Sequence, residues 1–136
     1  MHLCVKGGDA AIAFYESAFG GACTFKQMTG DGRGVMHANV EVFGSEVMLH
    51  DGFPEHDGDV AAPASGDRAH LAISINLRKP ADVDAMVKRA TDAGATVTCP
   101  PDDMFWGARY GRIRDPFGHV WAFNAPLEPA GAESAA

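Results

Sequence analysis

Aromatic and basic side chains gather in FWGARYG at 105–111 and continue into RIRDPFGHVWAF at 112–123. Trp106, Arg109 and Tyr110 stand in a segment interrupted by glycines, which is typical of a loop. An aromatic ring beside a guanidinium can stack on a planar or conjugated molecule, and loops at the rim of a cavity often hold ligands. We therefore predict that these three residues contact a ligand. The alternative is that Trp106 plugs one end of the sheet or a dimer seam.

Two histidines are candidates for acid/base chemistry. His37 lies in VMHANV, where strand alternation places it on one face with Asn39 and Glu41. A histidine in such a polar cluster could move a proton near neutral pH. The alternative is a solvated sheet face, opposite a core face made of Met36, Ala38, Val40 and Val42. His70 is the second candidate, as an acid/base or as a polar residue in a pocket wall.

The basic residues just before DPFG allow two interpretations. Arg112 and Arg114 alternate with Ile113 and should therefore share one strand face. They could bind an anionic substrate or lie in solvent. Asp115-Pro116-Phe117-Gly118 itself predicts a tight turn, because proline presets φ and glycine permits a positive φ.

Charge and cysteine usage restrict the partners and the compartment. The 136-residue chain has a net charge of −7, which argues against nucleic acid and anionic membrane surfaces. No apolar run is long enough to span a bilayer. Cys4, Cys23 and Cys99 are odd in number and form no CxxC pair, so we expect reduced thiols and a cytoplasmic protein.

These residues are carried by a pattern of strands and helices that occurs twice. Module one covers about 1–50 and module two about 70–125, each as strand, helix and three strands, with a linker at about 51–69 and a flexible tail at 126–136. Gly21-Ala22 and Gly94-Ala95, 73 residues apart, both follow a helix and begin a strand. The pattern predicts an α+β fold of two tandem βαβββ modules whose curved mixed sheet surrounds a pocket.

The sequence motifs within this repeat resemble those of a known superfamily. They are AIAFYESAFGG (11–21), VMHANV (35–40), VMLHD (47–51), DAGATV (92–97), FWGARYG (105–111) and DPFGHVWAF (115–123). In this order they resemble the vicinal oxygen chelate superfamily of glyoxalases, bleomycin-resistance proteins and extradiol dioxygenases, and in particular its PhnB-like branch. The resemblance implies one domain over 1–136, a U-shaped sheet around a pocket, and a homodimer.

The resemblance also implies where a metal would bind. Members that use a metal take a histidine from the first strand of a module and a carboxylate from its last strand. His70 stands at the histidine position of module two, but the carboxylate positions hold Met48 and Ala122. A thioether and a methyl group cannot hold a hard divalent cation. A divalent site made from His2, His50 and His70 is the weaker alternative.

We therefore predict a protein that binds a small organic molecule without the usual metal site and without another cofactor. Its predicted pocket contains Trp106, Arg109, Tyr110, His50, Met48 and Ala122. Two alternatives are a metal-dependent lyase, isomerase or dioxygenase with a non-standard histidine-rich site, and a metal-independent enzyme that uses His37 or His70 as acid or base. The sequence does not identify the ligand.

Overall fold

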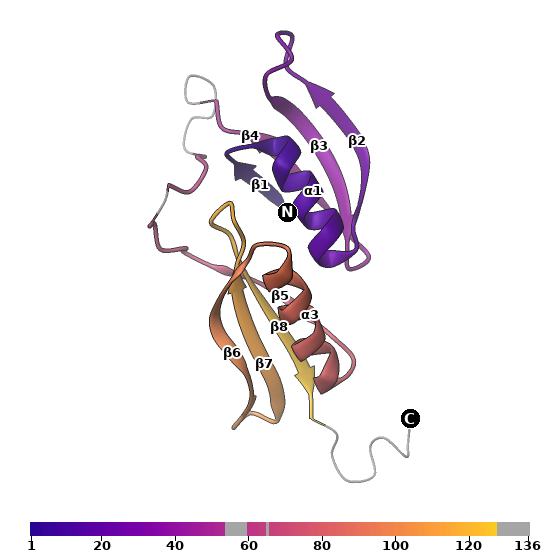
Figure 1. The fold of residues 1–136 in the computed structure, drawn as a ribbon, viewed down its shortest axis with the longest axis vertical. Helices are drawn as coiled ribbons and strands as arrows, with labels where there is room; N and C mark the ends of the chain where they lie inside the picture. The colour runs from indigo at the N-terminus through magenta and orange to yellow at the C-terminus, as the bar shows by residue number, and fades with distance from the viewer. Residues whose placement is uncertain (54–59, 65, 128–136) are drawn as a thin grey trace.

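Two βαβββ modules follow one another along the chain, as predicted (Figure 1). The computed structural model describes residues 1–53, 60–64 and 66–127. The first module consists of β1 (His2–Val5), α1 (Gly8–Phe19), β2 (Ala22–Met28), β3 (Val35–Val42) and β4 (Ser45–Asp51). The second consists of β5 (Ala72–Asn76), α3 (Pro80–Asp92), β6 (Thr96–Met104), β7 (Ala108–Arg114) and β8 (Val120–Pro126).

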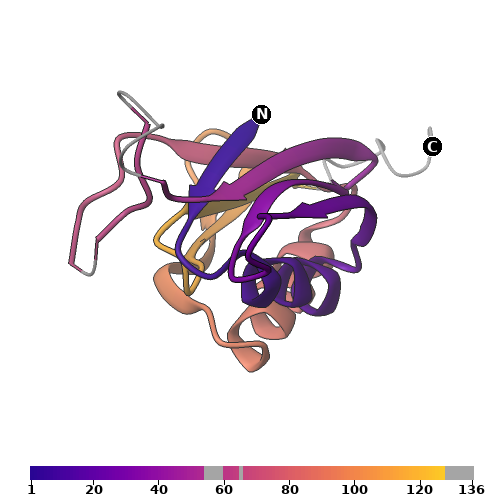
Figure 2. The same cartoon turned by 90° about the horizontal axis from the view of Figure 1, so that it is seen from above.

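Each module forms its own four-stranded mixed sheet. The strand orders are β1-β4-β3-β2 and β5-β8-β7-β6, so the same arrangement occurs twice. In each sheet the first and last strands of the module pair in parallel, and the other neighbours are antiparallel. The helices cover one side of the two sheets and leave the other side open (Figure 2). This arrangement confirms the predicted α+β class, with two sheets in place of one continuous sheet.

One hydrophobic core joins the two modules. Phe19 of α1 packs against Trp121 of β8, with 4.7 Å between the ring centroids. The Tyr15 hydroxyl donates a 2.6 Å hydrogen bond to Oδ2 of Asp115 in the other module. Burial and the Asp115 carboxylate raise the pKa of Tyr15 well above its usual range, so this hydroxyl keeps its proton. The modules therefore form a single packed unit.

The first helix begins without a side-chain cap from its own N-cap residue. It starts at Gly8 after Gly7, so Asp9 lies in its first turn and does not cap it. Oδ1 of Asp51, at the end of β4, accepts hydrogen bonds from the amides of Gly7 and Gly8 at 2.7 and 2.9 Å. A carboxylate 43 residues away thus satisfies the unpaired amides of the helix terminus.

Two strands also differ from the prediction. Met36 was expected in the core, but it is half exposed, because the pairing of β2 with β3 shifts register between Gln27 and Met28. Strand β6 continues through Pro100 and Pro101 to Met104, again with register shifts. The turn after it is short, so Arg109 and Tyr110 lie in β7 and not in a loop.

The segment between the modules and the end of the chain are only partly described. Part of the predicted linker at 51–69 and most of the predicted tail at 126–136 lie outside the described residues. Of the helices the structure does describe, none is long and apolar enough to cross a bilayer.

Candidate functional site

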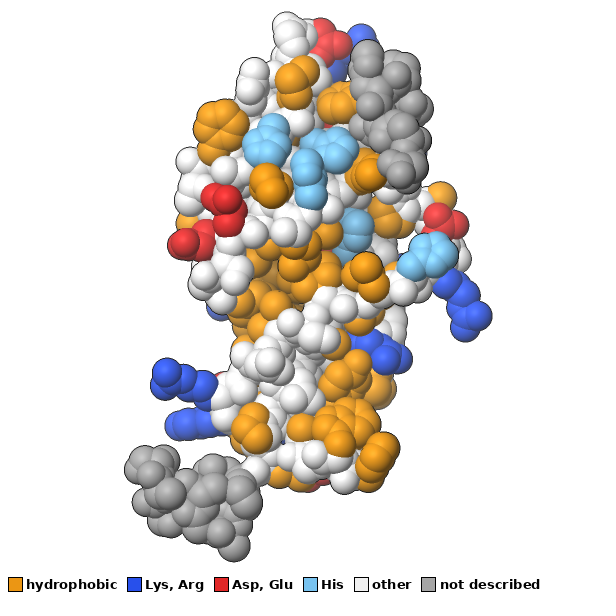
Figure 3. Space-filling view, turned by 180° about the vertical axis from the view of Figure 1, so that it is seen from behind, with side chains coloured by type: hydrophobic (Ala, Val, Ile, Leu, Met, Phe, Trp, Pro, Cys, Tyr) orange, Lys and Arg blue, Asp and Glu red, His pale blue; other side chains and the backbone are white. Residues whose placement is uncertain are grey.

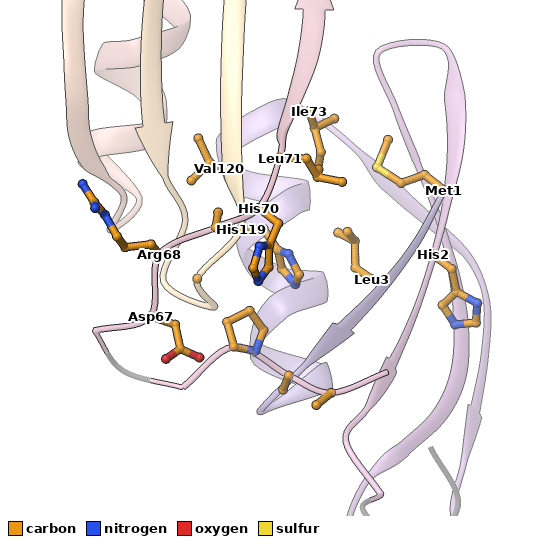
Figure 4. A pocket seen from close by; sticks show the side chains of 15 residues that line it. Met1, His2, Leu3, Asp67, Arg68, His70, Leu71, Ile73, His119 and Val120 are labelled. Atoms are coloured by element: carbon orange, nitrogen blue, oxygen red, sulfur yellow. The ribbon is translucent and has the colours of Figure 1, made fainter. Parts of the chain in front are cut away.

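A pocket of about 630 Å³ lies where the edge strands β1 and β5 of the two sheets approach each other (Figure 4). We call it the seam pocket. Its lining comes from β1, the segment between the modules, the start of β5 and the turn before β8: Met1, His2, Leu3, Ala61, Ala62, Pro63, Asp67, Arg68, Ala69, His70, Leu71, Ile73, Gly118, His119 and Val120. Both modules are therefore needed to build it.

The seam pocket combines an apolar wall with three histidines, His2, His70 and His119. Leu3, Leu71 and Ile73 are among the apolar residues of the wall, and His70 and His119 project toward the middle of the pocket (Figure 4). Nε2 of His119 lies 2.8 Å from the carbonyl oxygen of Cys4 in β1. A carbonyl only accepts hydrogen bonds, so Nε2 of His119 carries a proton and donates it to this contact. The backbone of one module thus fixes a pocket histidine of the other.

Three histidines, His2 among them, meet on the open side of the first sheet, which we call the histidine face. Nδ1 of His50 lies 2.8 Å from Nε2 of His2, and the His37 ring stands edge-on to His2 at 5.8 Å. Nε2 of His37 also lies 2.7 Å from Oδ1 of Asn39. In Figure 3 histidine side chains gather on this side of the upper half. Partial burial, and then the neighbouring His50 and His37, lower the pKa of His2.

The aromatic and basic residues of FWGARYG separate onto two faces of β7. Trp106 packs edge-on against Tyr110 at 5.5 Å, and its indole nitrogen donates to Oδ1 of Asn124 at 3.3 Å. Arg109 points the other way, because neighbouring strand residues alternate. Its guanidinium forms ion pairs with Asp84 of α3 at 3.0 Å and with Asp103 of β6 at 2.9 Å. Arg109 therefore does not join Trp106 and Tyr110 on the open side.

Comparison with known proteins identifies the family. The sequence model of the glyoxalase/bleomycin resistance protein/dioxygenase superfamily matches residues 1–123. The chain belongs to this superfamily. An uncharacterised protein of Mycobacterium tuberculosis strain H37Rv is 37% identical over 127 residues, which cover 93% of this chain and 72% of that protein.

Solved structures agree with this assignment at the level of the fold. A glyoxalase-related enzyme from Fulvimarina pelagi has a TM-score of 0.74 and 22% identity, over 92% of this chain and 84% of that one. A PhnB protein from Bacillus cereus has a TM-score of 0.68 and 18% identity, over 94% and 97% of the two chains. The expected superfamily is thus confirmed, and a PhnB protein is among its structural neighbours.

The residues at the metal positions of the superfamily do not fit a metal ion. Met48 pairs with His2 in the β1–β4 ladder, and Ala122 pairs with Ser74 in the equivalent β5–β8 ladder. Neither Met48 nor Ala122 offers an oxygen or nitrogen donor. Across residues 1–53, 60–64 and 66–127, no three His, Cys, Asp or Glu side chains are placed to hold a metal ion.

The seam pocket and the predicted pocket differ in composition. Of the predicted metal candidates, His2 and His70 line the seam pocket, whereas His50 lies on the histidine face. None of the residues predicted as pocket lining contributes to it: Trp106, Arg109, Tyr110, His50, Met48 and Ala122.

Sequence reasoning missed His119 and Arg68. His119 follows the turn at 115–118, for which only a structural role was predicted. Arg68 lies in the predicted linker. A signal for His119 was present, since a module's last strand lies beside its first in this fold. The start of HVWAF is therefore near the start of HLAISIN.

Proposed function

We propose that this protein binds a small organic molecule in the seam pocket and that binding does not require a metal ion. The observation that supports this most directly is the pocket itself. Its volume and its mixture of apolar wall with a few polar groups are those of small-molecule sites. Binding without a metal ion is supported by the side chains of Met48 and Ala122, because a thioether and a methyl group offer no oxygen or nitrogen ligand.

The lining residues suggest separate roles in binding. An apolar or planar part of the ligand would lie against Leu3, Leu71 and Ile73, where it leaves water. His70 and His119 would orient the ligand through hydrogen bonds. Because the Cys4 carbonyl already fixes the His119 ring, that histidine loses little conformational freedom on binding.

A thermal-shift screen with a small-molecule panel tests the proposal. We expect hits that raise the melting temperature of the wild type, with no product formed on prolonged incubation. Ala61→Trp should abolish the shifts, because an indole at this exposed position narrows the seam pocket without removing a core residue. Gly30→Ala is the control, since its added Cβ meets nothing within 4 Å. Hits that bind Ala61→Trp as well as wild type would contradict the site.

A metal-independent enzyme is the second candidate function, and the position of His70 in the seam pocket supports it. An imidazole that faces a ligand can exchange a proton with it near neutral pH. Conversion of any hit to product, lost in His70→Gln, would establish this candidate and reject pure sequestration.

Metal analysis of protein purified without an affinity tag tests the remaining alternative. We expect far less than one metal ion per chain, because the family positions lack donors. Near-stoichiometric zinc, nickel, manganese or iron, lost in His70→Ala, would overturn the proposed metal-independent binding.

We also propose that the protein is a homodimer. Large apolar side chains lie exposed outside the core, among them Phe25, Met36, Leu71, Phe105 and Trp106. A second copy that covers part of this surface would remove it from water.

A further inference from the structure

Two arginines project from the open side of the second sheet. In the β7–β8 ladder, Arg112 lies opposite Ala122 and Arg114 lies opposite Val120. The intervening Ile113 is fully buried on the helix side, opposite Trp121. Alternation therefore directs both guanidinium groups to the side that the helices leave open.

Neither arginine has an acidic partner among the residues that the structure describes. Arg112 contacts the Tyr110 hydroxyl at 3.4 Å and lies 5.9 Å from the centre of that ring. Arg114 donates to the carbonyl oxygen of Gly118 at 3.0 Å. By contrast, Arg109 in the same strand pairs with two carboxylates. In a chain with a net charge of −7, two adjacent half-buried guanidinium groups without a counter-charge require a separate explanation.

A hollow of about 360 Å³ lies in front of these arginines. Its lining adds Arg68, His70 and Thr98, so the polar groups that the described part of the chain contributes are cationic or hydrogen-bonding and none of them is acidic. It also shares Arg68, Ala69, His70, Leu71 and Val120 with the seam pocket. In Figure 4 Arg68 projects away from the seam pocket, on the side of β6 and β7. The two hollows thus adjoin on either side of the segment that leads into β5.

We propose that this hollow is an anion-binding site and that the protein's ligand is a small organic acid with a carboxylate or a phosphate-type group. Arg112 and Arg114 would hold the anionic group, with Arg68 and Thr98 at the rim. The apolar body of the same ligand would extend past His70 into the seam pocket; this part rests on the proposed function.

The chemistry of guanidinium suits this role. Its planar array of donors matches the oxygens of a carboxylate or phosphate and allows two parallel hydrogen bonds. Contact with the Tyr110 ring and with the Gly118 carbonyl fixes both groups in advance, which lowers the entropy lost on binding. Partial burial also reduces competition from water.

Nuclear magnetic resonance titrations with simple probes test the site. Benzoate and phenylphosphonate represent the two kinds of anion, benzamide is the neutral match to benzoate, and inorganic phosphate has no apolar body. We expect the anions to shift the Nε–H signals of Arg112 and Arg114. Binding should weaken about tenfold or more in Arg112→Gln/Arg114→Gln, since charge-assisted hydrogen bonds are lost. Arg33→Gln, in an exposed turn of the other module, should bind like the wild type.

The outcomes separate this inference from the proposed function. Unchanged anion binding in the double variant, or benzamide binding as tightly as benzoate, would overturn the anion site. Arg112→Lys is the control for loss of binding through misfolding. It keeps the positive charge and should therefore retain part of the affinity for phosphate. Suppose that Ala61→Trp binds phosphate and also binds the neutral hits as tightly as the wild type does. This result would reject the seam pocket as the binding site and would still support the anion site. A stronger response to benzoate or to phenylphosphonate identifies the type of acid.

Discussion

At the scale of single residues, the carboxylate of Asp115 is a buried polar link between the modules. It is 2% exposed, and Oδ2 accepts hydrogen bonds from Tyr15 at 2.6 Å and from the Trp121 indole at 2.9 Å. Oδ1 accepts from the backbone amides of Phe117 and His119 at 2.9 and 3.0 Å. The aspartate of DPFG thus shapes its own turn and also fastens the first helix to the second module.

Asp115→Asn should therefore be strongly destabilising. An amide keeps the shape but turns an NH2 group toward buried donors, which we expect to lower the free energy of unfolding by about 3 kcal/mol. Tyr15→Phe should cost about 1.5 kcal/mol through the loss of one charge-assisted hydrogen bond. Urea denaturation measures both. Asp92→Asn, in an exposed ion pair with Lys88, is the control and should change stability by less than about 0.5 kcal/mol. Equal effects of Asp115→Asn and Asp92→Asn would refute this role.

The histidine face should make stability depend on pH. The pKa of His2 is lowered in the folded protein, chiefly by partial burial and then by His50 and His37, so the unfolded chain binds this proton more readily. The stabilisation from neutral His2 is complete above about pH 6.5 and is lost as the pH falls through the folded pKa. We expect the difference in unfolding free energy between wild type and His2→Gln to decrease from pH 7 to pH 5. A difference that stays constant or grows toward pH 5 would be incompatible with this assignment.

At the scale of elements, the connection from α1 to β2 has almost no free space. A Cβ on Gly21 would lie 2.6 Å from Cγ1 of Val42 and 2.8 Å from the carbonyl oxygen of Glu41. The helix therefore approaches β3 closely only because this residue has no side chain. The preceding Gly20 ends the helix with a φ of 69°, which glycine adopts without strain.

Gly21→Ala should lower the free energy of unfolding by about 2 kcal/mol, because the backbone of β3 or α1 must move to admit the methyl group. Chemical denaturation followed by circular dichroism provides the measurement. Gly30→Ala, in the β2–β3 turn, should stay within about 0.5 kcal/mol of wild type. Similar costs for the two substitutions would show that close packing at residue 21 is not responsible.

At the scale of the whole molecule, the described helices and strands leave one side of both sheets without a covering layer (Figure 2). Phe105 is 96% exposed and Trp106 is 50% exposed at the turn between β6 and β7. The proposed homodimer predicts a solution mass of twice the 14.3 kDa chain by sedimentation equilibrium. Phe105→Ser should shift this equilibrium toward monomer without loss of folded structure, because the side chain makes no contribution to the core. A wild type that stays monomeric at high micromolar concentration would reject the dimer.

The sequence by itself determined the modular fold. Helix and strand periodicities and the glycines at chain reversals are local signals, and their occurrence twice indicated two equivalent modules. In the structure Met48 lies opposite His2 in the β1–β4 ladder and Ala122 lies opposite Ser74 in the β5–β8 ladder, so each residue lies beside the first strand of its own module.

Only the tertiary structure decided which of the chemically interesting residues meet. Alternation along β7 separated Arg109 from Tyr110, and a shift of register in β3 moved Met36 out of the core. The seam pocket arises from the packing of one module against the other, which brings His119 near the backbone of Cys4, 115 residues away. Such contacts depend on bulges and on non-local packing, and a strand pattern fixes neither of them.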